Sequence, residues 1–95
     1  MEKFTETTYF SVQPDVLYTM IDDEAVLMRG QDNTLYGVNA VATEIWQQLS
    51  TQPMTLQMLS AYLLEHFDVE ANECFNDTTA LLETLLEEKL IYIID

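Results

Sequence analysis

The sequence predicts a single α+β domain in which a three-stranded antiparallel sheet is followed by three helices. Segments rich in β-forming residues come first and are separated by short polar turns, whereas segments with apolar residues at helical spacing come afterwards. The length of 95 residues suits one hydrophobic core and leaves little room for a deep catalytic cleft. Hydrophobic residues make up 48% of the chain, which is enough to fill such a core.

Three segments have the composition of strands. Residues 16–21 and 24–28 flank the acidic pair at 22–23 and are predicted to form a hairpin. Residues 34–38 follow a turn at 30–33, whose small and Asx residues tolerate the backbone dihedrals of a reversal. The three strands form an antiparallel meander, and its apolar face needs a covering layer of helices.

The first residues of the chain have less defined features. Residues 1–13 form a polar lead-in that ends at Pro14, and we expect an N-terminal arm or an edge strand there. Residues 14–95 show no internal repeat, no low-complexity tract and no linker. They are therefore expected to form one domain.

Three helices are predicted from apolar residues that recur at helical spacing. The first covers residues 42–49, with Asn39 as a suitable N-cap, and ends before a proline that forbids its continuation. The second begins after an N-cap at Thr55 and ends near residues 66–68. The third covers residues 70–88, with acidic residues in its first turns that complement the helix dipole.

The third helix has a wide apolar stripe that exceeds the arc of ~100° required by one core contact. We expect one edge of the stripe to pack on the other helices and the second edge to face elsewhere, although both edges could also belong to the core. The first edge consists of Phe75, Leu82 and Leu86, and the second of Cys74, Thr78, Leu81 and Leu85, with Asp77 at its border.

The chain lacks the residue pairs that catalysis needs. It has a single histidine, His66, and a single cysteine, Cys74, and neither these nor the scattered serines have a spacing that pairs a nucleophile with a base. The acidic run 22–24 belongs to a turn and has no calcium-loop spacing. We therefore expect no enzyme activity, no cofactor and no metal site.

The predicted cellular location is the cytoplasm. One cysteine cannot form an internal disulfide, and the N-terminus has no secretory signal layout. No apolar stretch approaches the ~20 residues that span a bilayer.

Five short segments follow one another in a specific order and spacing. They are Pro14-Asp15-Val16, Asp23-Glu24-Ala25-Val26-Leu27, Leu35-Tyr36-Gly37-Val38-Asn39, Ile45-Trp46-Gln47-Gln48-Leu49, and Asp77-x-x-x-Leu81-Leu82-x-x-Leu85 followed by Leu90-Ile91. Together they resemble the PqqD-like family of small peptide chaperones, also called RiPP recognition elements, which hold the leader segment of a precursor peptide. Thr78, Thr79 and Lys89 depart from the family pattern, which usually has aliphatic residues at the first two positions and often glycine at the third.

The resemblance implies a winged helix-turn-helix whose third strand offers an open edge to the leader peptide, beside the third helix. Such strand addition uses main-chain hydrogen bonds for affinity and side-chain pockets for selectivity, and it needs no catalytic residue. The leader would then be passed to a modifying enzyme or a leader protease, with lasso peptide biosynthesis as the first expectation. Carried over, the groove is lined by Leu35, Tyr36, Gly37 and Val38 on one side and by Cys74, Asp77, Thr78, Leu81 and Leu85 on the other.

Two features of this groove have alternative explanations. Gly37 could let a guest backbone or ring approach closely, or it could mark a bulge or bend before the first helix. Asp77 and the acidic residues around the third helix predict a leader that carries Lys or Arg, whereas the other acidic residues could simply solvate the outer face.

Charge separates the competing functions. The chain has 17 acidic and 3 basic residues and a formal charge of -14, and no Lys or Arg lies between Arg29 and Lys89. Winged helices commonly bind DNA, but here the second and third helices carry no such cation for phosphates, so we expect neither nucleic acid nor an anionic membrane as a partner. The remaining alternative is an acidic interaction or inhibitory module that binds a basic protein partner.

Overall fold

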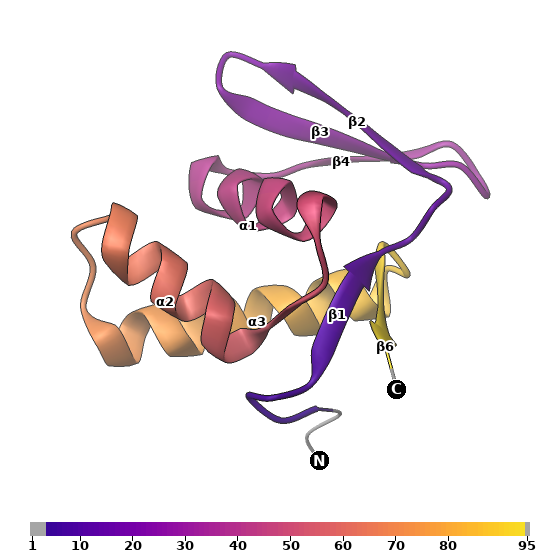
Figure 1. Cartoon of the computed structure of the whole chain (residues 1–95). Helices are drawn as coiled ribbons and strands as arrows, with labels where there is room; N and C mark the ends of the chain where they lie inside the picture. Colours follow the sequence, from indigo (N-terminus) through magenta and orange to yellow (C-terminus); the bar gives the residue numbers. More distant parts are fainter. Residues whose placement is uncertain (1–3, 95) are drawn as a thin grey trace.

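Three helices follow a three-stranded antiparallel sheet, as the sequence predicts (Figure 1). The computed structural model describes residues 4–94. The chain also contains a second, smaller sheet. The elements are β1 (Tyr9–Val12), β2 (Val16–Ile21), β3 (Glu24–Arg29), β4 (Thr34–Gly37), α1 (Ala40–Thr51), β5 (Met54–Thr55), α2 (Leu56–His66), α3 (Ala71–Glu87) and β6 (Ile91–Ile94).

The first sheet has the order β2-β3-β4. The polar residues between its strands adopt the backbone conformations that the turns need. Asp22 and Asp23 have φ angles of 51° and 69°, which a tight hairpin turn between β2 and β3 requires. Asn33 has a φ of 59° in the turn between β3 and β4. Gly30 is needed for close approach, because a Cβ there would lie 2.5 Å from the carbonyl oxygen of Asp15.

The second sheet has the order β5-β1-β6 and was not predicted. The expected arm or edge strand within residues 1–13 is corrected here, because β1 is the central strand of this sheet and pairs with both neighbours. Residues 1–3 of that segment lie outside the described part of the chain. Phe10 is fully buried, which anchors β1 in the core and explains why the segment does not remain a free arm.

The predicted N-caps begin the helices. Asn39 accepts a hydrogen bond from the amide of Ala42 at 2.9 Å, and Thr55 caps α2 in the same way. Glu70 is the N-cap of α3 rather than a residue of its first turn, since its carboxylate accepts from the amide of Glu73 at 2.7 Å. Of the helices in residues 4–94, none is both long and apolar enough to cross a membrane.

Helix α1 lies between the first sheet and the pair α2 and α3 (Figure 1). Its side chains Ile45, Trp46 and Leu49 are buried. The hydroxyl of Thr43 accepts a hydrogen bond from the amide of Ala25 at 2.8 Å, which ties α1 directly to β3. These apolar side chains of α1 belong to one core with Leu27 of the sheet and Leu82 of α3.

The expectations for the two edges of the α3 stripe are met only in part. Leu82 of the first edge is buried and Leu86 packs against the core, as expected. Phe75, which was expected to pack on the other helices, is 37% exposed. Cys74, Thr78 and Leu85 of the second edge are instead buried, together with Leu82. These four positions recur at helical spacing, so α3 turns that line toward the core and leaves Phe75 at the rim.

Helix α3 and its C-cap, Glu88, are followed by a residue with a strained backbone, which allows a stability prediction. Lys89 has a φ of 60°, and its amide donates to the carbonyl of Leu86 at 3.1 Å, in a helix-ending conformation that favours glycine. Lys89→Gly is expected to raise the free energy of unfolding by about 1 kcal/mol, measured by urea denaturation. Lys89→Ala is the control, because it removes the same charge and keeps the Cβ; equal stability of both variants would show that charge, not conformation, matters.

Candidate functional site

A pocket with a volume of about 430 Å³ lies where the start of α1, the loop between α2 and α3, and α3 itself meet. Its floor is apolar and buried, and acidic residues form its rim. The floor includes Ala42, Ile45, Leu63 and Cys74, the rim includes Asp68, Glu70, Glu73 and Asp77, and Asn39, Val41, Phe67, Val69, Thr78 and Leu81 complete the lining.

The strand β4 leads to this pocket and has an unpaired edge. Within residues 4–94, β4 pairs only with β3. The amide of Val38 donates to the carbonyl of Ala25 in β3 at 3.1 Å, and successive residues of a strand direct their N–H and C=O groups to opposite sides. The N–H and C=O groups of Leu35 and Gly37 therefore point toward the open edge.

A polar network fixes the far end of β4 against the end of α3. The hydroxyl of Tyr36 donates to Oε2 of Glu88 at 2.9 Å, and the guanidinium of Arg29 lies 5.5 Å from the centre of the Tyr36 ring. Arg29 also donates to the carbonyl of Glu88 and pairs with Asp32 at 2.7 Å. The open edge thus runs from this network, through Val38, to the pocket.

The network persists around neutral pH. The hydrogen bonds from Arg29 hold the pKa of Asp32 well below its usual value, so this ion pair contributes stability above the ordinary pKa of aspartate and loses it as the pH falls. Burial, followed by the hydrogen bond to Glu88, raises the pKa of Tyr36. The contribution of Tyr36 is therefore present at neutral pH and is lost only as the pH rises through that raised pKa.

The structure brings together part of the predicted site. Cys74, Asp77, Thr78 and Leu81 line the pocket, although the side chains of Cys74 and Thr78 are largely buried. Leu85 does not line it and belongs to the core. The residues from β4 contribute the open edge and the network rather than the pocket itself.

Two parts of the pocket were missed from the sequence. The start of α1, including Val41, and the α2–α3 loop, including Phe67 and Val69, both line it. Val69 is 43% exposed although it is apolar. Its place between Asp68 and Glu70 is the one signal in the sequence that could have indicated this part of the pocket.

The described chain gives no reason for a glycine at position 37. Gly37 pairs regularly with Val26 of β3, its φ is not positive, and a Cβ placed on it would meet no atom within 4 Å. The bulge or bend is therefore not observed at this residue, and nothing within the described chain requires glycine there.

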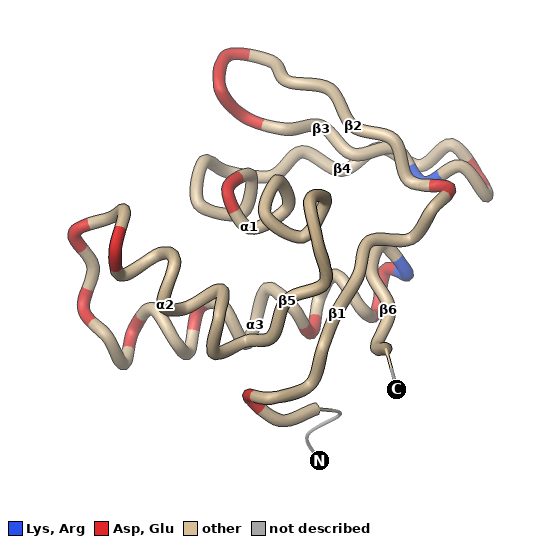
Figure 2. The backbone as a smooth tube through the Cα atoms, viewed as in Figure 1, with Lys and Arg blue, Asp and Glu red and all other residues tan. Residues whose placement is uncertain are grey.

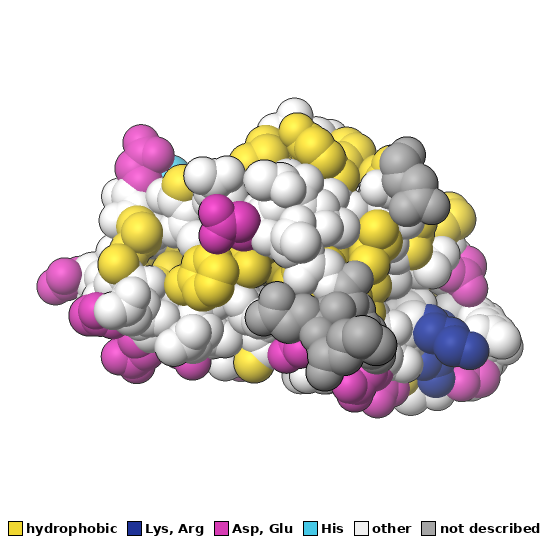
Figure 3. All heavy atoms as spheres, turned by 90° about the horizontal axis from the view of Figure 1, so that it is seen from below, with side chains coloured by type: hydrophobic (Ala, Val, Ile, Leu, Met, Phe, Trp, Pro, Cys, Tyr) yellow, Lys and Arg dark blue, Asp and Glu magenta, His cyan; other side chains and the backbone are white. Residues whose placement is uncertain are grey.

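Charge is distributed unevenly along the molecule. The two described cations, Arg29 and Lys89, lie at one end, and acidic residues occupy the opposite end at the β2–β3 turn and the α2–α3 loop (Figure 2). Figure 3 shows acidic side chains spread along the face seen from below, and the basic side chains that it colours lie at the right-hand end. The acidic rim of the pocket is thus far from both cations.

Comparisons with known proteins support the fold. Among solved structures, TbiB1 in complex with the TbiA(beta) leader peptide has a TM-score of 0.78 and 25% identity, covering 85% of this chain and 93% of that one. A lasso peptide synthetase B1 complexed with the leader peptide has a TM-score of 0.76 over 87% of this chain and 96% of that one, and its 23% identity supports the fold alone.

The comparison with family models gives the assignment. No curated protein matches the chain. The family model described as coenzyme PQQ synthesis protein D (PqqD) matches residues 24–91. That range contains the first sheet from β3 onward and all three helices. Because the matched residues make up well over half of this chain, the chain belongs to the PqqD family.

Proposed function

We propose that the protein binds the leader segment of a ribosomally made precursor peptide and presents it to a modifying enzyme or a leader protease, without catalysing a reaction itself. The observation that carries this proposal is the unpaired edge of β4, which ends at an apolar pocket beside α3. Two similar structures, both complexes with leader peptides, support it. One of them is a lasso peptide synthetase B1, which makes a lasso peptide precursor the first class to test.

The leader binds as an additional strand. Its backbone pairs with the N–H and C=O groups of Leu35 and Gly37, and alternate side chains turn toward α3. One of them enters the pocket, where Ile45 and Leu63 offer apolar contacts. Because ordering a flexible peptide costs entropy, submicromolar affinity needs a net gain of about 8 kcal/mol, which backbone pairing must share with such an apolar anchor.

The acidic rim selects a leader with Lys or Arg near this anchor. Asp68, Glu73 and Asp77 are exposed around the pocket mouth, and no described cation lies among them. A basic leader is therefore attracted to the pocket end of the edge, and this attraction weakens with salt. The competing function, an acidic module that binds a basic protein by charge alone, needs neither an open strand edge nor a pocket.

Reversing one rim charge tests the selection. Asp77→Lys is expected to weaken binding of a synthetic basic leader about tenfold in 50 mM salt, and the deficit shrinks in 300 mM salt because the lost interaction is a solvent-exposed charge pair. Fluorescence anisotropy of the labelled leader measures both affinities.

The matched control is Asp23→Lys, which makes the same charge change at the β2–β3 turn. It is expected to leave affinity within about twofold. Equal losses in both variants would favour binding by total charge, as in the competing function.

A further inference from the structure

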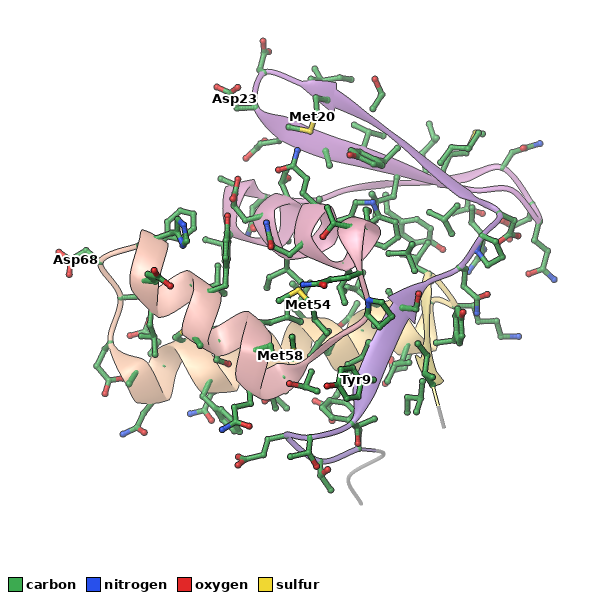
Figure 4. The ribbon with its side chains drawn as sticks, in the orientation of Figure 1. Tyr9, Met20, Asp23, Met54, Met58 and Asp68 are labelled. Atoms are coloured by element: carbon green, nitrogen blue, oxygen red, sulfur yellow. The ribbon has the colours of Figure 1, made fainter. Side chains whose placement is uncertain are left out.

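The first sheet has a second face, directed away from α1, that the proposed leader site does not use. Ala25 and Leu27 of β3 are buried against the core, so Val26 and Met28 point the opposite way. On β2, Met20 points toward α1, where its sulfur is 3.7 Å from the Gln47 amide nitrogen (Figure 4). We call the opposite side, formed by Leu17, Thr19, Ile21, Val26, Met28 and Leu35, the outer sheet face.

The outer sheet face is apolar and uncovered by the described chain. The strand register places Leu17, Met28 and Leu35 in one row across the three strands. Leu17 is 61% exposed, Leu35 65% and Ile21 56%. A contiguous group of large apolar side chains left this open on a small protein indicates a contact surface.

Gly37 supports the same conclusion independently. It lies on the outer sheet face, because it pairs with Val26, whose side chain points to that face. Glycine inside a strand costs stability and packs nothing, and here no internal contact requires it. The open space above it fits a side chain from another molecule.

Charge identifies the kind of molecule. Asp22, Asp23 and Glu24 border the outer sheet face at the β2–β3 turn, where Figure 4 shows Asp23 at the tip of the hairpin. Two copies of a chain with a charge of -14 repel each other, and an anionic lipid surface is repelled as well. The face therefore fits a protein with an apolar patch bordered by Lys and Arg.

We propose that the outer sheet face docks the enzyme that acts on the precursor, and that this docking is separate from leader binding. The inference rests on the proposed function for the choice of partner. Leu35 and Gly37 lie on β4, the strand that receives the leader, so an enzyme docked here sits next to the bound precursor. Proximity of this kind raises the effective concentration of the substrate.

The test uses the purified leader-processing enzyme encoded beside the precursor, titrated onto the full-length protein without leader present. The double substitution Leu17→Ser with Ile21→Ser is expected to weaken enzyme docking at least about tenfold, because two exposed apolar contacts are lost. Leader affinity, measured separately by anisotropy, is expected to stay within about twofold. Leu64→Ser is the control, since Leu64 is 42% exposed on α2, away from the sheet.

Several results would overturn the inference. One is unchanged enzyme docking in the double variant, and another is an equal loss in Leu64→Ser. If the protein forms a dimer in sedimentation and the double variant does not, the face binds a second copy of the chain. If the protein binds phosphatidylcholine–phosphatidylglycerol vesicles and the double variant does not, the face binds lipid. Failure of the unmodified protein to bind leader, with enzyme docking intact, would instead refute the proposed function alone.

Discussion

Replacing Leu81 by glutamate is expected to weaken leader binding at least about 100-fold while the fold persists. Leu81 is half-buried on the α3 wall of the pocket, one helical turn from Asp77. The apolar anchor of a bound leader would cover the new carboxylate and offer it no hydrogen-bond partner, which costs several kcal/mol. The loss is therefore larger than that from reversing a rim charge. Isothermal titration with the leader measures it.

The matched control for this substitution is Leu64→Glu. Leu64 is exposed on α2 and does not line the pocket, so the same chemical change there is expected to leave affinity within about twofold. Circular dichroism and urea denaturation of both variants check the fold. Collapse of helical content in Leu81→Glu alone would mean that Leu81 serves the core and not the groove.

Among residues 4–94, the edge of β4 stays open because the N-terminal segment pairs elsewhere. Strand β1 could have completed the first sheet at β4, which would have left no edge for a guest strand. It pairs instead with β5 and β6, on the other side of α1. This arrangement uses the N-terminal segment to close the core while the edge of β4 stays available.

Local sequence signals predicted the first sheet and the helix starts well. The Asx residues at 22–23 and 33 adopt the positive φ angles that their turns need, and Asn39 and Thr55 begin their helices. These features depend on neighbouring residues only, so a single sequence can display them.

Features that depend on distant pairing were not predictable. The second sheet joins Tyr9 to Thr55 and to Ile94, and β5 is only two residues long, so no periodic pattern marks it. The wide stripe of α3 did not show which edge would be buried, since the orientation of the helix is set by packing against α2 and β6. The pocket likewise combines α1 with the α2–α3 loop, which only the tertiary fold brings together.

Leu35→Pro is expected to weaken leader binding by about 10- to 100-fold. The free energy of unfolding is expected to change little. The N–H of Leu35 points to the open edge and not toward β3, so proline removes no hydrogen bond of the first sheet. It does remove a donor for the guest strand, and a buried carbonyl of the leader then lacks a partner. Proline is tolerated on an edge strand for the same reason.

Leu35→Ala separates the backbone from the side chain in this experiment. It trims the same side chain, which lies on the outer sheet face, and keeps the N–H. Leader affinity is therefore expected to fall much less in Leu35→Ala than in Leu35→Pro, when both are measured by titration alongside thermal unfolding. Strand addition to β4 would be refuted if Leu35→Pro folded normally and bound the leader as tightly as Leu35→Ala, because main-chain pairing at this edge is the interaction that the proposed function cannot lack.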